Sequence, residues 1–357
     1  MSEVLPAGKL PPELLGKLLA TIPDDPSIVI GAGVGRDAAA VRYGDRVLVL
    51  KSDPITFATD EIGWYAPNVN ANDIACMGAT PRWMLATALL PDRDTTPELV
   101  ERIFTSLRGA CAALGVLLVG GHTEITTGLE RTIIAGTMIG DAREEDLVDP
   151  RHAQAGDAVI LARGIAIEGT CLISREMADE LIPMLGTELV ERSQRFLHEP
   201  GISVVPAARL LHGELGRELH GMHDPTEGGL ATGLREIATA AGTGILVERD
   251  PIPVYPETAA ICAALSLDPL GLIASGALLA TVSRDTANRA VALLNEAGIQ
   301  AARIGTLLAD PNQILMRAGG RETDLPEFAV DEIARLFAGA VHPSIRQLID
   351  KPPSLLF

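Results

Sequence analysis

The sequence predicts a mixed α/β protein built from two domains, and three observations support this fold class. Before residue 141, apolar strand-like runs follow one another through short turns, which is typical of a mixed or antiparallel sheet. After residue 156, such runs alternate with amphipathic helical segments, which is typical of an α/β domain. Residues 141–156, between the two patterns, are rich in charged and turn-forming residues. We therefore expect domains at residues 1–150 and 151–357.

Composition and charge exclude several functional classes. Hydrophobic residues make up 47% of the 357 residues and charged residues 21%, as in soluble globular proteins, and no apolar run is long enough to span a membrane. The first residues lack a signal-peptide pattern, and the four cysteines are too dispersed for a disulfide or zinc framework. The net charge of −18 and the aromatic content of 3% disfavour nucleic-acid binding. We expect a cytoplasmic protein without a membrane or nucleic-acid partner.

A glycine-rich loop stands near the start of the chain. A short apolar run leads into Gly31, Gly33 and Gly35, and such a loop can bring backbone N–H groups close to a phosphate. It is not a P-loop, because Arg36-Asp37 stands where that motif needs Gly-Lys-Ser/Thr. A Rossmann fingerprint is also excluded, since the strand expected at 46–50 leaves no room for a crossover helix.

A helix expected at residues 59–77 carries unusual polar residues. Thr59-Asp60-Glu61 offers an N-cap and an acidic first turn. Asn72 and Asp73 stand in the apolar body of the helix, although Asn and Asp are unfavourable inside helices. Either they form a polar face open to water, or they line a site. Pro67 should kink this helix or mark its true start.

The remaining elements follow from apolar periodicity and capping residues. The strand at 116–119 is expected to be buried and to lead into a tight turn at Gly120-Gly121-His122-Thr123-Glu124. The other strands are expected at 83–90, 131–140, 158–162, 244–247, 277–282 and 302–307. The other helices are expected at 11–19, 96–114, 168–181, 200–215, 230–241, 257–264, 285–297 and 330–338, with a glycine-rich turn at 221–229.

Three aspartates, Asp37, Asp53 and Asp73, are candidate Mg²⁺ ligands. Asp37 ends the glycine-rich loop, and Asp53 ends the following strand after Lys51-Ser52. Mg²⁺ takes oxygen ligands and commonly bridges one or two carboxylates to substrate phosphates. Each aspartate taken alone could be a turn or cap residue, but Asp53 and Asp73 have no structural reason to stand where they do. Together they predict a metal-nucleotide site.

Two further segments are candidates for the same site. His122 follows a glycine pair and is a polar residue, a weak base or a metal ligand; the sequence leaves this open. Asp224 and Thr226 stand at a helix N-terminus, which favours anions, although Pro225-Thr226 also suits a helix cap. Serine-nucleophile and zinc-hydrolase motifs are missing. The predicted cofactor-binding residues are Gly33, Gly35, Asp37, Lys51, Asp53, Asn72, Asp73, Gly120, Gly121, His122, Thr123, Asp224 and Thr226.

These motifs, in this order, resemble the aminoimidazole ribonucleotide (AIR) synthase-related, or PurM-like, superfamily. Gly35-Arg36-Asp37-Ala38-Ala39 is similar to its Gly-[Glu/Asp]-Asp-Ala-Ala segment, and Lys51-Ser52-Asp53 to its strand-ending Thr/Ser-Asp. Residues 70–79 resemble its Asn-Asp-[Ile/Leu]-Ala-x-Met-Gly-Ala helix, and residues 120–123 its Gly-Gly-[Asp/Glu/His]-Thr turn. Residues 164–170 and 223–231 look most like the branch of the hydrogenase maturation protein HypE.

The resemblance implies a PurM-like fold in a homodimer, with the N-terminal mixed sheets of two subunits forming a shared β-barrel. It also implies ATP and Mg²⁺ bound between the domains and across the dimer, with Asp37, Asp53 and Asp73 contacting metal and phosphate. Family members use ATP to phosphorylate an amide or similar oxygen, or a small acceptor. The acceptor implied for this chain is a small molecule or a protein-borne group.

Departures from the HypE pattern leave alternatives. HypE ends in Pro-Arg-Ile-Cys, whose cysteine carries the group being dehydrated, whereas the sequence here ends in Pro352-Pro-Ser-Leu-Leu-Phe357. We therefore do not expect that tail chemistry in its usual form. His122 also replaces the acidic residue of the HypE turn. The alternatives are an ATP-binding maturation factor without turnover alone, and a small-molecule kinase resembling thiamine-monophosphate kinase, which Pro81-Arg82-Trp83 favours.

Overall fold

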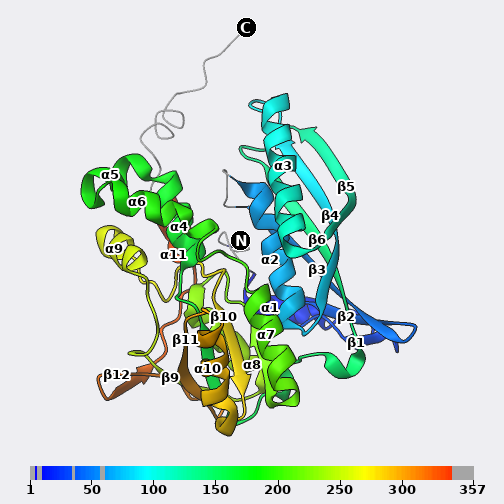
Figure 1. Ribbon diagram of the computed structural model, residues 1–357, viewed down its shortest axis with the longest axis vertical. Helices are drawn as coiled ribbons and strands as arrows, with labels where there is room; N and C mark the ends of the chain where they lie inside the picture. The colour runs from blue at the N-terminus through cyan, green and yellow to red at the C-terminus, as the bar shows by residue number, and fades with distance from the viewer. Residues whose placement is uncertain (1–4, 6–9, 34–36, 57–60, 340–357) are drawn as a thin grey trace, which may run out of the picture.

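The chain folds around two mixed β-sheets, one in each half (Figure 1). The computed structural model describes residues 5, 10–33, 37–56 and 61–339. The first sheet has the strand order β1-β2-β3-β6-β4-β5, and the second has the order β13-β12-β9-β11-β7-β10-β8. The β4–β5 pair and the β9–β12 pair are parallel, and the other neighbouring strands are antiparallel. The predicted mixed α/β class with two sheet-containing halves is confirmed.

Helices cover one face of the first sheet. Its strands are β1 (Ile28–Ile30), β2 (Ala39–Tyr43), β3 (Arg46–Ile55), β4 (Thr80–Pro91), β5 (Leu117–Thr126) and β6 (Ile133–Ala142). The helices of this half are α1 (Pro12–Leu19), α2 (Ile62–Cys76) and α3 (Pro97–Leu114). Figure 1 shows α2 and α3 side by side along one face, with the strands exposed on the other. A hairpin joins β2 to β3, and their strands pair from Ala39 with Leu50 to Tyr43 with Arg46.

The second half surrounds its own sheet with more helices. The strands are β7 (Ala158–Ala162), β8 (Leu219–His223), β9 (Gly244–Glu248), β10 (Leu278–Val282), β11 (Ala301–Leu308), β12 (Ile314–Ala318) and β13 (Arg321–Asp324). The helices are α4 (Ile167–Glu176), α5 (Ala178–Leu185), α6 (Thr187–Gln194), α7 (Val205–Leu215), α8 (Gly229–Ala241), α9 (Pro256–Leu265), α10 (Ala287–Glu296) and α11 (Glu332–Gly339). Within the described residues, no helix is both long and apolar enough to cross a bilayer.

Helix α2 lies at the centre of the molecule. All of its residues except Trp64 are buried, and its apolar side chains belong to a core that continues into α7 and β8 of the second half. Asn72 and Asp73 are inside this core, so the interpretation of a polar face open to water is wrong. Pro67 lies within the helix, so the prediction that it marks the start is also wrong. The predicted cap residues Thr59 and Asp60 lie outside the described residues.

Strand β5 corrects the prediction of a buried strand followed by a tight turn. Gly120 to Glu124 continue the strand, paired in parallel with β4. The strand lies at the sheet edge, so Leu117 and Val119 are exposed. At Gly121 a Cβ atom would lie 1.8 Å from the Ala86 carbonyl oxygen, so the glycine permits close pairing rather than a turn. The irregular register beside it, between Met84 and Leu85, is typical of a β-bulge.

Other differences from the predicted elements are local. The segment predicted as one helix at 168–181 is two helices, α4 and α5, because the backbone leaves the helical region at Met177 (φ −121°). The predicted helix at 200–215 begins only at Val205. Strand β8 was not predicted, because a buried strand of sequence Leu-His-Gly-Met-His shows no alternation of polar and apolar residues. Strands β12 and β13 and helix α6 were also not predicted.

Candidate functional site

Four aspartates from both halves of the chain meet between the two sheets. Lys51 Nζ lies 3.0 Å from Asp73 Oδ1 and 3.7 Å from Asp53 Oδ2. A ligating atom of Asp37 and one of Asp224 lie within 4.8 Å of each other and of a His223 ring nitrogen. The electrostatic influence of Asp37 and Asp53 reaches Asp73, as does that of Asp224. We call Asp37, Asp53, Asp73 and Asp224 the acidic cluster.

Local structure explains how these carboxylates come together. Asp37 lies two residues before β2, Asp53 lies near the end of β3, and Asp224 follows β8. Asn70 on α2 fixes the backbone at Asp53, since its amide accepts from the Asp53 N–H (3.0 Å) and donates to the Asp53 carbonyl (3.2 Å). The partner of Asp53 on β6 is Gly136, where a Cβ atom would lie 2.5 Å from the Asn70 side chain. Helix α2 therefore packs closely enough to bring Asp73 to Lys51.

The acidic cluster contains more carboxyl groups than its neighbouring cations can balance when all of these groups are ionised. Burial alone would lower the pKa of Lys51, but attraction to Asp73, Asp53 and Asp37 raises it, so this lysine is charged. Burial raises the pKa of Asp73 well above its usual range, Lys51 opposes this, and repulsion from the other three aspartates adds to it. Burial and repulsion from Asp37 raise the pKa of Asp224 to about 7. Such a site favours an added cation.

His223 is an ion-pair partner rather than a free metal ligand. Its Nδ1 lies 2.7 Å from Asp37 Oδ1, and its Nε2 lies 2.9 Å from Glu236 Oε2. Burial would lower the pKa of this imidazole, but the two carboxylates raise it well above its usual value. With both ring nitrogens donating, neither offers a lone pair to a metal ion. The carboxylates are therefore the better candidates for metal ligands.

Asp224 has a buried carboxyl oxygen that lacks a hydrogen-bond partner among the described residues. Its Oδ2 atom is buried and accepts no hydrogen bond from the described residues, while Oδ1 lies 3.7 Å from the Cys76 thiol. A buried carboxylate oxygen without a partner carries a desolvation cost that a bound cation would remove. The acidic cluster thus fits a hard divalent cation such as Mg²⁺, which prefers oxygen ligands.

Some of the predicted cofactor-binding residues lie in the acidic cluster, and others lie elsewhere in the structure. The predicted residues that meet there are Asp37, Lys51, Asp53, Asp73 and Asp224. Asn72 does not join them, because its side-chain amide accepts from the Val204 N–H (2.8 Å) and donates to the Ile202 carbonyl (2.9 Å). Gly33 is partly exposed in the loop before Asp37, and Gly35 lies outside the described residues. Thr226 lies in the turn after Asp224, and its carbonyl accepts from the Gly229 and Ala274 N–H groups.

The segment from Gly120 to Thr123 does not reach the cluster within one chain. Asp53, Gly136, Ala86 and Gly121 form one row across β3, β6, β4 and β5. Three inter-strand steps, about 14 Å, therefore separate Asp53 from Gly121. His122 is exposed and lies 3.3 Å from Glu124. The part played by these residues stays a prediction.

Sequence reasoning missed His223, Glu236 and Cys76. His223 stands directly before Asp224 in the motif at 223–231, and this adjacency was the available signal. Glu236 lies on α8, 13 residues after His223, and the two side chains meet only in the folded chain. The sequence indicates only that Cys76 is a small buried residue, and the contact of its thiol with Asp224 depends on the tertiary structure.

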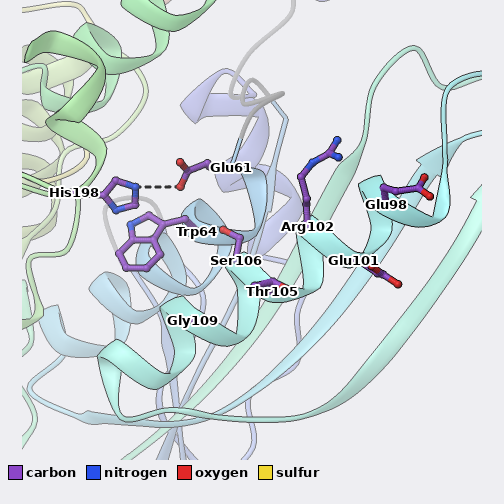
Figure 2. Close-up of a pocket in the computed structure, with 9 residues that line it drawn as sticks. All are labelled: Glu61, Trp64, Glu98, Glu101, Arg102, Thr105, Ser106, Gly109 and His198. Carbon is purple, nitrogen blue, oxygen red and sulfur yellow. Dashed lines mark hydrogen bonds and ion pairs between the residues drawn. The ribbon is translucent and has the colours of Figure 1, made fainter. Parts of the chain in front are cut away.

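A separate pocket of about 590 Å³ lies between α2, α3 and the segment after α6 (Figure 2). Glu61 and His198 lie 3.0 Å apart, within hydrogen-bond distance, on one side of it, and the Trp64 and His198 rings pack edge to face at 4.6 Å. Arg102 and the exposed face of α3 form the other wall. None of the acidic-cluster residues lines this pocket, so the pocket is distinct from the acidic cluster.

Comparison with known proteins agrees with this architecture. The AIR synthase related protein family matches through its N-terminal domain at residues 35–142 and its C-terminal domain at residues 154–317. Carbamoyl dehydratase HypE of Rhizobium leguminosarum bv. viciae is 31% identical over 306 residues, which are 81% of this chain and 83% of that protein. A Methanocaldococcus jannaschii protein described as a candidate hydrogenase expression/formation protein is 28% identical over 333 residues, covering 89% and 94%.

Solved structures show the same fold. A HypE–HypF complex matches with a TM-score of 0.72 and 24% identity, over 88% of this chain and 99% of that one. HypE in complex with ATP matches with a TM-score of 0.69 and 24% identity, over 80% and 87%. The fold, the two matched domains and the identity to HypE proteins agree with one another. The chain belongs to the AIR synthase related protein family, in its HypE branch.

Proposed function

We propose that this protein is an ATP- and Mg²⁺-dependent enzyme that phosphorylates an amide or similar oxygen of its acceptor and releases ADP. The observation that carries the proposal is the buried acidic cluster, in which four aspartates face one lysine and Asp224 Oδ2 has no partner among the described residues. Relatives named carbamoyl dehydratase, and a HypE solved with ATP, support ATP as donor and a carbamoyl amide as the acceptor class.

Each residue of the cluster has a role in this proposal. Asp37, Asp53, Asp73 and Asp224 would hold Mg²⁺, which would neutralise charge on the transferring phosphoryl group. Lys51 orients Asp53 and Asp73 through its ion pairs. His223 holds Asp37 in place and is itself fixed by Glu236. The loop that contains Gly33 would cradle the phosphates. We assign the ATP and metal site to an N-terminal domain of residues 1–150, with residues 151–357 as the C-terminal domain.

A homodimer is part of the same proposal. The face of the first sheet opposite α2 and α3 exposes large apolar side chains, among them Trp83 and Leu85 at 38% and 40%. A patch of this kind is typical of a protein interface. Pairing two such faces would cover it, and β5 of one subunit could then bring His122 and Thr123 toward the partner's acidic cluster. This would explain why those residues lie far from the cluster of their own chain.

A protein partner is also part of the proposal. The solved HypE–HypF complex supports a partner that delivers a protein-borne acceptor group. It also keeps open the alternative of a maturation factor that binds ATP without turning it over alone. The kinase alternative has weaker support, because the thiamine-monophosphate kinase structures share the fold at 18–19% identity.

Calorimetric titration with Mg²⁺ and ATP tests the site assignment. We expect Asp53→Asn and Asp73→Asn each to weaken Mg²⁺-ATP binding at least about tenfold, because each removes a charged ligand from a buried site. Asp45→Asn is the matched control, since Asp45 lies in the exposed turn between β2 and β3. Unchanged affinity in both site variants would overturn the assignment, and tight binding without ADP formation would favour the maturation-factor alternative.

A further inference from the structure

Glu168 is a buried acid that the proposed metal site does not use. It lies in the first turn of α4 and is 5% exposed, and its Oε2 atom makes no hydrogen bond to the described residues. Ser275 is 1% exposed, and its hydroxyl is near enough to the Glu168 carboxyl to lower the pKa of that group, although the two form no hydrogen bond of good geometry. A structural role at the helix N-terminus would not require such burial, because solvent exposure there costs less. A buried carboxyl oxygen without a well-formed hydrogen bond, next to a buried hydroxyl in the same state, indicates a place for a ligand.

Backbone hydrogen bonds connect these two residues to the turn that carries Asp224. The Gly169 N–H donates to the Ile273 carbonyl (3.1 Å), which ties the residue after Glu168 to the segment before Ser275. The Ala274 N–H donates to the Thr226 carbonyl (3.2 Å), two residues beyond Asp224. Asp331 accepts from the Gly228 N–H (2.6 Å) and the Ile273 N–H (3.3 Å) and holds both segments together. Glu168, Ser275 and Asp224 therefore stand on or next to backbone segments that hydrogen bonds join to one another.

The charges around Glu168 also connect it to the acidic cluster. Burial raises the pKa of Glu168 to about 7, the Ser275 hydroxyl opposes the rise, and repulsion from Asp331, Glu227 and Asp53 adds to it. Asp53 belongs to the first sheet, so Glu168 lies near enough to the first half of the chain for a member of the acidic cluster to affect its pKa. An acid in this state can accept a proton near neutral pH.

Resting on the proposed function, we infer that Glu168 is the group that takes the proton from the acceptor during phosphoryl transfer, with Ser275 positioning the acceptor amide. The acceptor oxygen forms a bond to the γ-phosphorus as the bond from that phosphorus to the β,γ-bridging oxygen breaks. The electron pair of the broken bond leaves with ADP. The proton that the acceptor loses, from its amide nitrogen or from water in simple hydrolysis, passes to the Glu168 carboxylate.

The test compares variants in ADP formation, with water and with N-acetyl-S-carbamoylcysteine as acceptors. We expect Glu168→Gln to lower kcat about 100-fold or more, the usual contribution of a general base, with Mg²⁺-ATP affinity changed less than threefold. Ser275→Ala should raise KM for the carbamoyl probe more than it lowers kcat. Glu191→Gln, an exposed change on α6, is the matched control. In Glu168→Ala, added formate should restore at least tenfold of the lost rate, which a merely structural residue would not allow.

The outcomes separate this inference from the proposed function. Normal kcat in Glu168→Gln, or no rescue by formate in a folded Glu168→Ala that binds Mg²⁺-ATP, would overturn the role of Glu168 alone. Failure of the wild-type protein to bind Mg²⁺-ATP or to form ADP would instead overturn the proposed function. Circular dichroism of each variant shows whether it has folded.

Discussion

Lys51 is the residue whose removal should disturb the acidic cluster most. Its ammonium group is paired with Asp73 and Asp53 in a mostly buried position. Lys51→Met leaves those carboxylates without their nearest cation, so we expect the free energy of unfolding to fall by about 3–5 kcal/mol in metal-free buffer. Urea denaturation measures this loss. Added Mg²⁺ should recover more stability in the variant than in the wild type.

A matched lysine provides the control. Lys17 pairs with Glu13 on α1, and both side chains are more than two-thirds exposed, at 71% and 85%. Lys17→Met should change the free energy of unfolding by less than about 0.5 kcal/mol, because exposed pairs are screened by water. Equal losses in the two variants would contradict the buried, unbalanced charge of the acidic cluster.

Glu168 predicts a pH dependence of stability. Its pKa rises from 4.5 to about 7 on folding, so the folded state retains a proton that the unfolded state releases between these values. Its contribution to stability is therefore present at pH 4 and is lost as pH rises through 7, by about 3 kcal/mol in total. Urea denaturation from pH 4 to pH 8 should show a shallower decline in Glu168→Gln than in the wild type. Parallel pH profiles would contradict a buried, unpaired Glu168.

At the scale of elements, α2 joins the two halves through Asn72. Its amide satisfies the Val204 N–H and the Ile202 carbonyl, both buried with it. Asn72→Ala should lower the free energy of unfolding by about 2–4 kcal/mol, because two backbone groups lose their partners. Mg²⁺-ATP affinity should stay within threefold of wild type, and the exposed change Asn312→Ala should alter neither. Weakened nucleotide binding at unchanged stability would restore Asn72 to the predicted ligand set.

The sequence predicts the site better where polar residues conflict with their local context. Asp53 at a strand end and Asp73 in an apolar helix have no local function, so their presence indicated a site, and the structure brings both to Lys51. Asn72 showed the same conflict, yet it serves contacts between the two halves, which no local pattern reveals. The glycine pair at 120–121 suggested a turn because glycine serves both turns and close strand pairing. The role of His223 depends on Glu236 in the following helix and on Asp37, which is 186 residues away in the sequence.

At the scale of the whole molecule, the open face of the first sheet predicts a dimer. Leu85→Glu places a charge in the centre of this face, and charges at the core of an interface oppose association. Light scattering coupled to gel filtration should give twice the 37.5 kDa chain mass for wild type and one chain mass for the variant. Ile182→Glu, at an exposed apolar position on α5, is the control and should stay dimeric. A monomeric wild type would contradict the proposed homodimer.

The central claim is that the acidic cluster binds the metal of a metal-nucleotide complex. Anomalous diffraction from crystals grown with Mn²⁺ and a non-hydrolysable ATP analogue tests it most directly, because Mn²⁺ replaces Mg²⁺ at oxygen sites and is located by its own scattering. The account predicts an anomalous peak within coordination distance of carboxylate oxygens of Asp37, Asp53, Asp73 and Asp224, next to the analogue's phosphates. A bound nucleotide whose metal lies away from these four carboxylates would contradict it.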